Sequence, residues 1–266
     1  MSGQFHFGWL PDPPDHRDLM YSAPVGVVSA LPSQVDLRPQ CPPVYDQGHL
    51  GSCTANAIAG AVQFDRLKAG QKPDFVPSRL FVYYNERALH HSVGSDSGAN
   101  VRDGVKTVHN LGVCPETEWP YSDVGAPANE GGPFDPGAPA AQQPPQSAYQ
   151  DATRYELVTY QRIQQTLSQL RGCLAEGYPF AFGFTVYQNF FDANGVPLTT
   201  TPMPSGGAVG GHAVVGVGYN DSTSLFTIRN SWGSAVLDAG YFYMPYAYVT
   251  ESTLASDFWT LRGMSS

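Results

Sequence analysis

Basic residues are scarce in this chain of 266 residues, which has 14 Lys and Arg against 23 Asp and Glu and a net charge of −9. This balance argues against binding to nucleic acid or to an anionic membrane, because both need a basic surface. No run of about 18 apolar residues is present, so we expect no membrane-spanning helix. Residues 1–10 lack the basic and apolar regions of a secretory signal peptide, which leaves a cytoplasmic location or another export route open.

Cysteine is also scarce, and no CxxC pair is present to hold zinc. The cysteines are Cys41, Cys53, Cys114 and Cys173. These are too few for a disulfide scaffold, and the pairing among Cys41, Cys114 and Cys173 is left open. The neighbouring His90 and His91 have no partner at helical spacing, so we expect solvated surface histidines there. The sequence therefore indicates no metal site and calls for no cofactor.

Glycine (28), proline (23) and aromatic residues are plentiful, and 42% of the residues are hydrophobic. Such a composition can fill a core and favours short strands and long loops over an all-helical fold. Apolar spacing and capping residues predict helices over 53–68, 78–89, 99–110 and 163–176. Runs of β-branched and aromatic residues predict strands over 179–187, 212–219, 225–229 and 240–244.

The order of these elements predicts an α+β chain with a mainly helical first half and an antiparallel β second half. Residues 122–147 contain six of the prolines and no apolar periodicity, which is typical of a long loop. We expect a short N-terminal segment over 1–30, a helical lobe over 31–150 that includes this loop as an insertion, and a β lobe over 151–266.

The most informative stretch runs from Asp46 to Ala57, D-Q-G-H-L-G-S-C-T-A-N-A. Cys53 begins the best predicted helix, where the helix dipole favours a thiolate. Gln47, six residues earlier, is able to donate its amide to an oxyanion. Cys53 is therefore a candidate nucleophile, although a small buried cysteine at a helix start is an equally ordinary interpretation.

Two later motifs favour the catalytic interpretation. His212 follows two glycines at the start of a predicted strand, and Asn230 opens the run N-S-W-G eighteen residues further on. An imidazole beside Cys53 would hold the thiolate and protonate a leaving amine. The Asn230 amide would orient that ring, and Trp232 would shield their bond from water.

In their order along the chain, Gln, Cys, His and Asn, these residues resemble the papain family of cysteine peptidases. The segment L-P-S-Q-V-D-L-R from Leu31 resembles the start of a mature domain of that family, and W-P-Y from Trp119 resembles its Y-P-Y stretch. The resemblance covers about residues 31–250. His212 lies 159 residues after Cys53, more than the usual 130–150, and the 122–147 insertion accounts for the surplus.

The resemblance implies a two-lobed papain-like fold, with a central helix carrying Cys53 and a β-barrel-like lobe carrying His212 and Asn230. It implies a cysteine endopeptidase without metal or cofactor that acts as a monomer on peptides or proteins. Cys53 matches the nucleophile, His212 the general base, Asn230 the ring orienter and Gln47 the oxyanion donor. The substrate-binding positions that it implies are Gly51, Ser52, Gly98, Ala99, Gly211 and Trp232.

The chain also departs from the family pattern. The cysteine usual three positions before the nucleophile is Leu50, its partner near the glycine loop is Asp96, and Thr54 replaces the usual Trp. These changes and the short N-terminal segment resemble the bacterial branch of the family. Two alternatives stay open: a catalytically silent peptide-binding module of the same fold, and transfer of the acyl group to an amine.

Residues 1–30 combine prolines with Phe5, Phe7, Trp9 and Leu10. The prolines exclude a long helix, and a segment this short has no core of its own in which to bury aromatic side chains. We expect it to lie extended in or across the substrate cleft as an inhibitor. The alternative is an arm packed on the back of the molecule. We also expect the helix start and His212 to lower the pKa of Cys53.

Overall fold

The structure is a computed structural model that describes residues 5–265. Its eight-stranded sheet has the order β1–β3–β8–β4–β5–β6–β7, and β2 pairs with β5. The strands are β1 (Met20–Tyr21), β2 (Gln34–Asp36), β3 (Leu157–Ile163), β4 (Phe180–Tyr187), β5 (Ala208–Asn220), β6 (Leu225–Arg229), β7 (Tyr241–Pro245) and β8 (Ala255–Met264). The α-helices are α1 (Val25–Val28), α2 (Cys53–Lys68), α3 (Arg79–Ala88), α4 (Val101–Leu111), α5 (Gln146–Ala152), α6 (Leu167–Ala175) and α7 (Tyr246–Val249).

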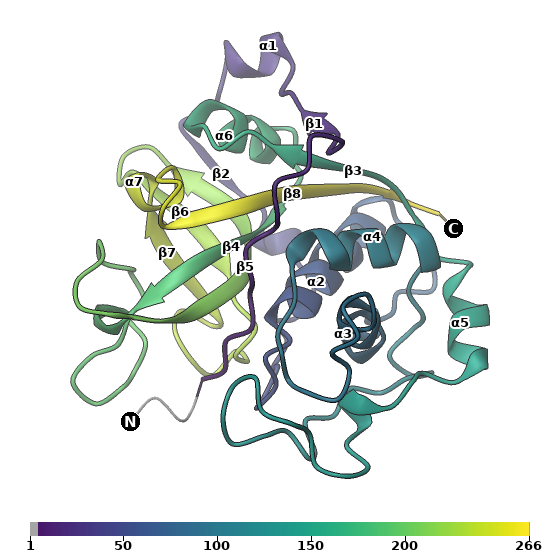
Figure 1. Cartoon of the computed structure of the whole chain (residues 1–266). Coiled ribbons are helices and arrows are strands. Elements are labelled where there is room, and N and C mark those ends of the chain that lie inside the picture. The colour runs from purple at the N-terminus through teal and green to yellow at the C-terminus, as the bar shows by residue number, and fades with distance from the viewer. Residues whose placement is uncertain (1–4, 266) are drawn as a thin grey trace.

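Helices α2, α3 and α4 lie beside the sheet, and the N-terminal segment runs along the junction between the two (Figure 1). Every residue of α2 from Cys53 to Arg66 is buried. A helix that is buried all round needs small or apolar residues on every face, which the Ala-rich sequence of α2 provides. Because α2 packs against β5 and β8, its first residue lies next to the strand that carries His212.

The sheet is held by aromatic side chains from neighbouring strands. Phe182 of β4 and Phe258 of β8 stack with ring centres 5.0 Å apart, and Phe180 packs against both. The first five residues of β4 are all buried, because both faces of this strand are covered. The central strands therefore form a rigid support for the side chains at their ends.

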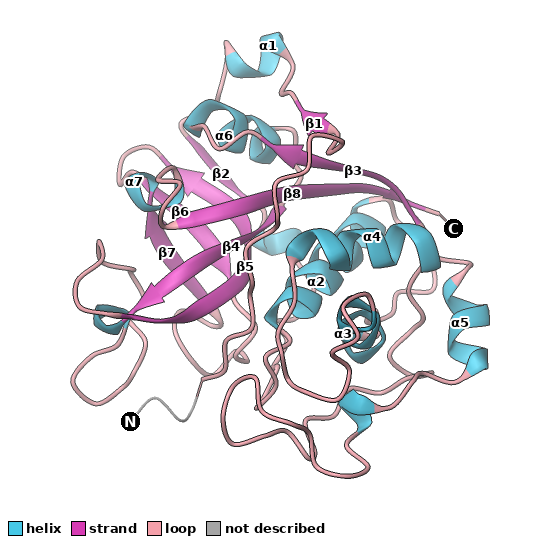
Figure 2. Cartoon of the chain, viewed as in Figure 1, coloured by secondary structure: helices cyan, strands magenta, loops and turns pink. Residues whose placement is uncertain are grey.

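The predicted α+β class is confirmed, and the secondary structure in Figure 2 agrees with most predicted elements. The helix predicted over 53–68 and the strand predicted over 225–229 have the predicted bounds. The helix predicted from Ile163 is wrong at its start, because Ile163 ends β3 and α6 begins at Leu167. Strand β8 was not predicted, since Ser256 and Asp257 interrupt its apolar pattern. Its pairing with β4 also shifts register between Ala181 and Gly183.

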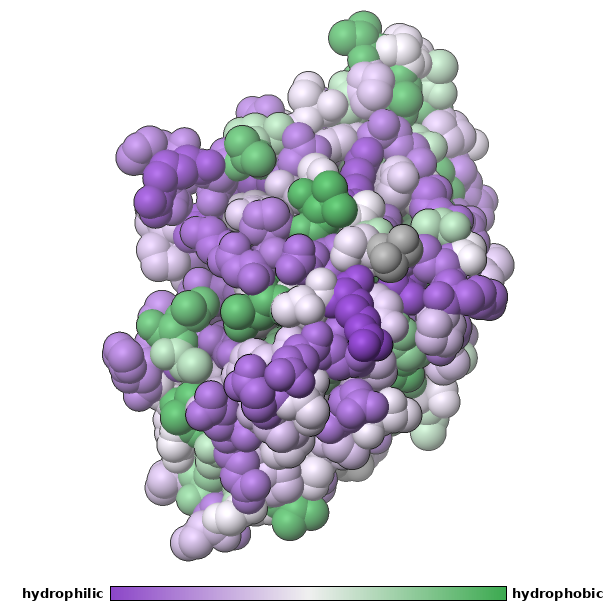
Figure 3. Space-filling view, turned by 90° about the vertical axis from the view of Figure 1, so that its right-hand side faces the viewer, coloured by the Kyte–Doolittle hydropathy of each residue, from purple (hydrophilic) through white to green (hydrophobic). Residues whose placement is uncertain are grey.

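The face of the molecule drawn in Figure 3 is mainly polar. On the face drawn in Figure 3, hydrophilic side chains predominate and apolar ones lie scattered in small groups. Within residues 5–265, no helix is long and apolar enough to cross a membrane. Over the same range, no three His, Cys, Asp or Glu side chains gather as metal ligands would.

Candidate active site

Cys53 is the first residue of α2 and is completely buried. Ser52, the residue before the helix, turns its hydroxyl to Tyr121 at 2.6 Å and makes no capping bond to the helix. The backbone N–H groups of Thr54 and of Ala213 in β5 approach the Cys53 sulfur and favour its charged form. Because Ala213 follows His212, the thiol lies beside the strand position that carries the imidazole.

His212 is oriented by residues that follow β6. Its Nε2 lies 2.7 Å from Oδ1 of Asn230, and the Ser231 amide donates to the same oxygen at 2.9 Å. Since Oδ1 only accepts, Nε2 carries the proton in the neutral ring and Nδ1 is the basic nitrogen. Nδ1 is buried and has no hydrogen-bond partner among residues 5–265. Trp232 stacks on the ring with centres 4.7 Å apart and shields it.

Gln47 is completely buried and its side chain is held at both ends. Its Oε1 accepts a hydrogen bond from the Ser231 hydroxyl at 2.6 Å. Its Nε2 donates to the carbonyl of Leu50 at 2.8 Å and to that of His6 at 3.1 Å. The amide thus points at a peptide carbonyl of the N-terminal segment, as an oxyanion donor points at a substrate carbonyl.

The predicted lowering of the Cys53 pKa is wrong for this arrangement of the chain. Burial raises the pKa of the Cys53 thiol to about 12, and burial lowers the pKa of His212 to about 4. Both shifts favour the uncharged forms, because neither group is in contact with water. The Gly8 amide of the N-terminal segment also bonds the thiol, and this bond lowers the pKa by less than burial raises it.

A hydrogen bond joins the loop around Asp96 to the loop before Cys53, at the place where the family pattern has a disulfide. The Asp96 carboxylate accepts from the Gly51 amide at 2.9 Å, so the loop around Asp96 is fastened to the loop before Cys53. The four cysteines of the chain are all unpaired within the described residues. Buried, charge-assisted hydrogen bonds are strong enough for such a fastening.

Residues 7–10 lie in the groove between these loops and β5. Gly211 accepts from the amides of Gly8 and Trp9 at 3.0 and 2.8 Å. On the other side, the Ala99 amide donates to the Gly8 carbonyl at 2.8 Å and the Leu10 amide donates to Ala99 at 2.9 Å. The segment therefore forms backbone pairs with both walls of the groove, which is the usual way to bind an extended peptide.

Glycine is required where the segment passes closest to the nucleophile. A Cβ on Gly8 would lie 1.8 Å from the carbonyl oxygen of Gly51, and a Cβ on Gly98 would lie 2.1 Å from that of Gly8. Two aromatic side chains before Gly8 pack against residues of the site. Phe7 meets the His212 ring edge-on at 5.9 Å, and Phe5 packs on Trp232 at 4.5 Å.

The long loop predicted over 122–147 also contacts the segment. Glu130 in this loop accepts from the Phe7 amide at 2.9 Å. The loop is itself paired with the loop of Asp96, through bonds from Gly131 to the Asp96 carbonyl and from Asp96 to the Gly132 carbonyl. The insertion thus forms part of the wall that holds the segment.

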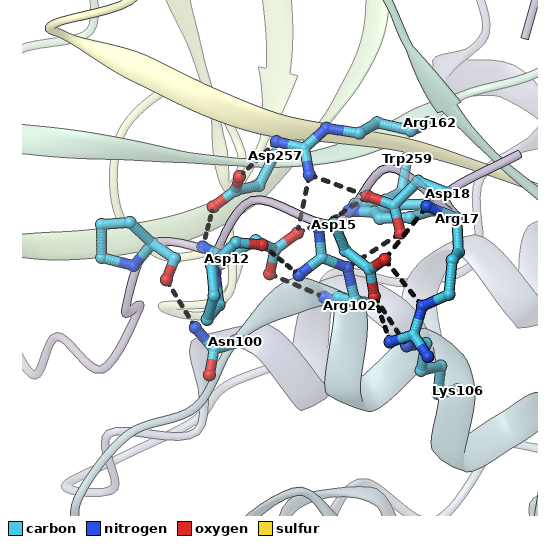
Figure 4. A network of polar contacts seen from close by, with 12 residues as sticks. Asp12, Asp15, Arg17, Asp18, Asn100, Arg102, Lys106, Arg162, Asp257 and Trp259 are labelled. Atoms are coloured by element: carbon cyan, nitrogen blue, oxygen red, sulfur yellow. Dashed lines mark hydrogen bonds and ion pairs between the residues drawn. The ribbon is translucent and has the colours of Figure 1, made fainter. Parts of the chain in front are cut away.

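Beyond the groove, a buried polar network anchors the segment, as Figure 4 shows. Asp12 accepts from the indole of Trp259 at 2.9 Å, and its own amide donates to Asp257 at 2.8 Å. Asp18 pairs with Arg102 at 2.6 Å, and Arg162 bridges Asp18 and Asp257 at 3.1 and 2.9 Å. Ion pairs between buried partners are costly to break singly, so the network holds residues 12–18 firmly.

The structure brings together all four predicted catalytic residues and most predicted substrate-binding residues. Gly51, Gly98, Ala99 and Gly211 face the segment, and Trp232 covers the imidazole. Ser52 does not face the groove, because its hydroxyl is bonded to Tyr121 and Asn56. Sequence reasoning missed Ser231, which lies within the quoted N-S-W-G run, and Asp257, whose strand was not predicted.

His90 and His91 lie apart from this site, at the end of α3. His90 pairs with Asp103 at 2.7 Å, and its side chain is 55% exposed, as expected for a surface histidine.

Comparison with known proteins agrees with this geometry. A family model described as papain family cysteine protease matches residues 31–259. A peptidase C1-like protein of Acanthamoeba polyphaga mimivirus is 36% identical and aligns over 97% of this chain and 86% of its own length. The crystal structure of xylellain, a cysteine protease from Xylella fastidiosa, has a TM-score of 0.91 and 49% identity, covering 98% of this chain and 96% of xylellain.

A procathepsin B from Trypanosoma congolense has the same fold, with a TM-score of 0.75 at 15% identity over 97% of this chain and 87% of its own. The predicted resemblance is confirmed. The chain belongs to the papain family of cysteine proteases and has the papain-like α+β fold of a cysteine peptidase.

Proposed function

We propose that Cys53, His212, Asn230 and Gln47 carry out peptide-bond hydrolysis in this peptidase, and that the N-terminal segment inhibits it. The observation that carries the proposal is the hydrogen bond from His212 Nε2 to Asn230, which leaves the basic Nδ1 of this buried ring without a partner among residues 5–265. A base oriented in this way is the partner that a thiol nucleophile needs.

The reaction has two steps. His212 Nδ1 takes the proton of Cys53, the sulfur attacks the substrate carbonyl carbon, and Gln47 donates to the developing oxyanion. The carbon–nitrogen bond breaks as Nδ1–H protonates the leaving amine, which leaves a thioester on Cys53. Water then attacks the thioester and gives a proton to Nδ1. The carbon–sulfur bond breaks, which releases the acid and restores the thiol.

The N-terminal segment is proposed as a ligand of the chain's own cleft. Its support is the pairing of Gly8 with Gly211 and Ala99, together with the Gln47 amide on the His6 carbonyl. These contacts use the groups on which a substrate depends, so segment and substrate exclude each other. The desolvation that raises the pKa of Cys53 to about 12 further keeps the nucleophile inactive while the segment is bound.

Replacing Gly8 by alanine is expected to raise the rate of hydrolysis of a fluorogenic peptide by the intact chain by about 10- to 100-fold. The added Cβ overlaps the Gly51 carbonyl oxygen, and overpacking of this kind costs about 1–3 kcal/mol, or about tenfold per 1.4 kcal/mol in the fraction of open chains. Iodoacetamide should alkylate Cys53 faster by a similar factor, as followed by mass spectrometry.

Gly26→Ala is the matched control, because it lies in the same segment and a Cβ there meets nothing within 4 Å. A synthetic peptide of residues 5–17 should inhibit the Gly8→Ala chain. Equal rates for the two variants and no inhibition by the peptide would refute autoinhibition and leave the catalytic roles standing. An unreactive Cys53 and no hydrolysis by either variant would instead refute the catalytic assignment.

Raising the pH from about 4 to 6 is expected to release the segment. Burial, and then the charge of Asp257, raise the pKa of Asp12 to about 6, whereas a solvated Asp has a pKa of about 3.9. The bound segment therefore holds more protons than the released one between these values. Binding is favoured below this range and is lost as the pH rises through 6.

The measurement is the ratio of the rate of the intact chain to that of the Gly8→Ala chain between pH 4 and 7, since the intrinsic pH dependence of catalysis cancels in it. The ratio should rise by up to about tenfold per pH unit, and Asp12→Asn should flatten it. Asp18, Arg102 and Arg162 also face this carboxylate, and the arginines keep their charge over this range. A ratio that falls with pH would contradict the assignment to Asp12.

A further inference from the structure

The Trp9 side chain occupies a hollow beside the reaction centre. Trp9 is only 7% exposed and follows Gly8, whose amide lies against the Cys53 thiol. One wall of the hollow exists because residue 183 of β4 is glycine. A Cβ there would lie 1.9 Å from the Trp9 Cε2 atom, so any larger residue at this position would fill the space of the indole. The hollow is thus deep enough for a bicyclic side chain.

Asp257 presents a hydrogen-bond acceptor inside this hollow. Its Oδ2 lies 3.2 Å from the indole Nε1 of Trp9, and the residue is only 2% exposed. The backbone of Asp257 has a positive φ of 60°, and the pairing of β4 with β8 shifts register between Ala181 and Gly183. Bulges of this kind redirect side chains beside active sites, and a positive φ at a non-glycine residue costs free energy. The backbone at Asp257 is therefore strained in the conformation that directs its carboxylate into the hollow.

The charge on Asp257 is already compensated. Arg162 donates to its Oδ1 at 2.9 Å, while its Oδ2 accepts from the Trp9 indole and from the Asp12 amide of the same segment. When the segment leaves, Asp12 and Asp18 leave with it, whereas Arg162 remains paired with Asp257. The vacated hollow then presents a carboxylate whose charge Arg162 already balances. Such a site favours a neutral N–H donor over a lysine or arginine side chain.

We propose that this hollow, formed by Gly183 and Asp257, selects a tryptophan side chain of the substrate. The proposal rests on the peptidase function above and names the substrate class of the same site. The preferred substrate side chain is thus bicyclic and donates one hydrogen bond.

The test is a competition in one tube between two peptides that differ at one residue. A tryptophan is first moved through each position of an alanine-rich peptide, and the best-cut position is retained. That tryptophan is then replaced by 3-benzothienylalanine, which has the same shape with sulfur in place of N–H. The ratio of kcat/KM for the two peptides does not depend on how many chains are open, so the intact chain serves as the enzyme.

We expect the tryptophan peptide to be cut about 10- to 100-fold faster, the usual effect of a hydrogen bond to a charged group. In Asp257→Ala the ratio should fall close to one, and in Asp257→Asn part of it should return, because the amide oxygen still accepts. Asp151→Ala, on the distant α5, is the matched control and should keep the ratio. Circular dichroism checks that each variant folds.

A ratio near one in the unmodified chain overturns the proposal without any variant, and so does an undiminished ratio in a folded Asp257→Ala. If neither peptide is cut by the intact chain or by the Gly8→Ala chain, the catalytic proposal fails instead. The hollow is then judged by competitive binding of the same two peptides to the Gly8→Ala chain, where equal binding overturns it.

Discussion

Alanine at position 53 is expected to lower peptide hydrolysis by about 10⁴-fold or more, the scale on which proteases lose activity without their nucleophile. The substitution is best made in the Gly8→Ala chain, whose open cleft gives the larger starting rate. Cys53 is packed between Thr54 and Ala213, and the shorter side chain leaves the helix start in place. Initial rates on a fluorogenic peptide provide the measurement.

Cys41→Ala is the control, because Cys41 is only partly buried and bonds the Leu37 carbonyl, outside the site. It should keep the full rate. Substantial hydrolysis by the Cys53→Ala chain, with Cys41 intact or removed, would show that another group is the nucleophile.

Gln47→Ala is expected to lower kcat by about 10²–10³ and leave KM nearly unchanged, as loss of one oxyanion donor does in a protease. Gln47→Glu separates this role from a structural one. Its carboxylate still accepts from Ser231, as Oε1 of Gln47 does, but it has no N–H to donate to the oxyanion. We expect it to be as inactive as the alanine variant.

Asn230→Ala should be less damaging than Gln47→Ala, since Trp232 stacks on the imidazole at 4.7 Å and still confines it. The two variants are compared by kcat and KM on one peptide. If the Asn230 variant loses more activity than the Gln47 variant, the roles assigned to these two amides are exchanged.

Local sequence predicted those parts of the molecule whose signals lie within one element. Helix α2 has its predicted bounds because Gly51 and Gly70 flank a continuous Ala-rich run. The catalytic candidates were found in the same way, since Cys53, His212 and Asn230 each stand in a glycine- or tryptophan-marked motif. Their proximity follows from the fold, which the family resemblance supplied.

Features that depend on distant residues could not be read from the sequence. Asp257 faces the hollow because of a register shift between two strands, one of which has no clear apolar period. The pKa of Cys53 was predicted in the wrong direction because it depends mainly on the complete burial of the thiol, which the helix start alone does not reveal. The family resemblance implied a substrate-binding role for Ser52, whereas its hydroxyl bonds Tyr121.

The stretch that joins the segment to the rest of the chain determines how the inhibitor acts once it is cut. This stretch includes α1, where Val25 is 85% exposed and accessible to a protease. While the chain is intact, the segment competes with substrate at an effective concentration in the millimolar range, whatever the protein concentration. A cut near Val25 leaves every contact of Gly8 and Asp12 in place but ends that advantage. Inhibition by the cut segment then depends on the protein concentration. The cleaved protein would remain inhibited at high concentration and become active when it is diluted.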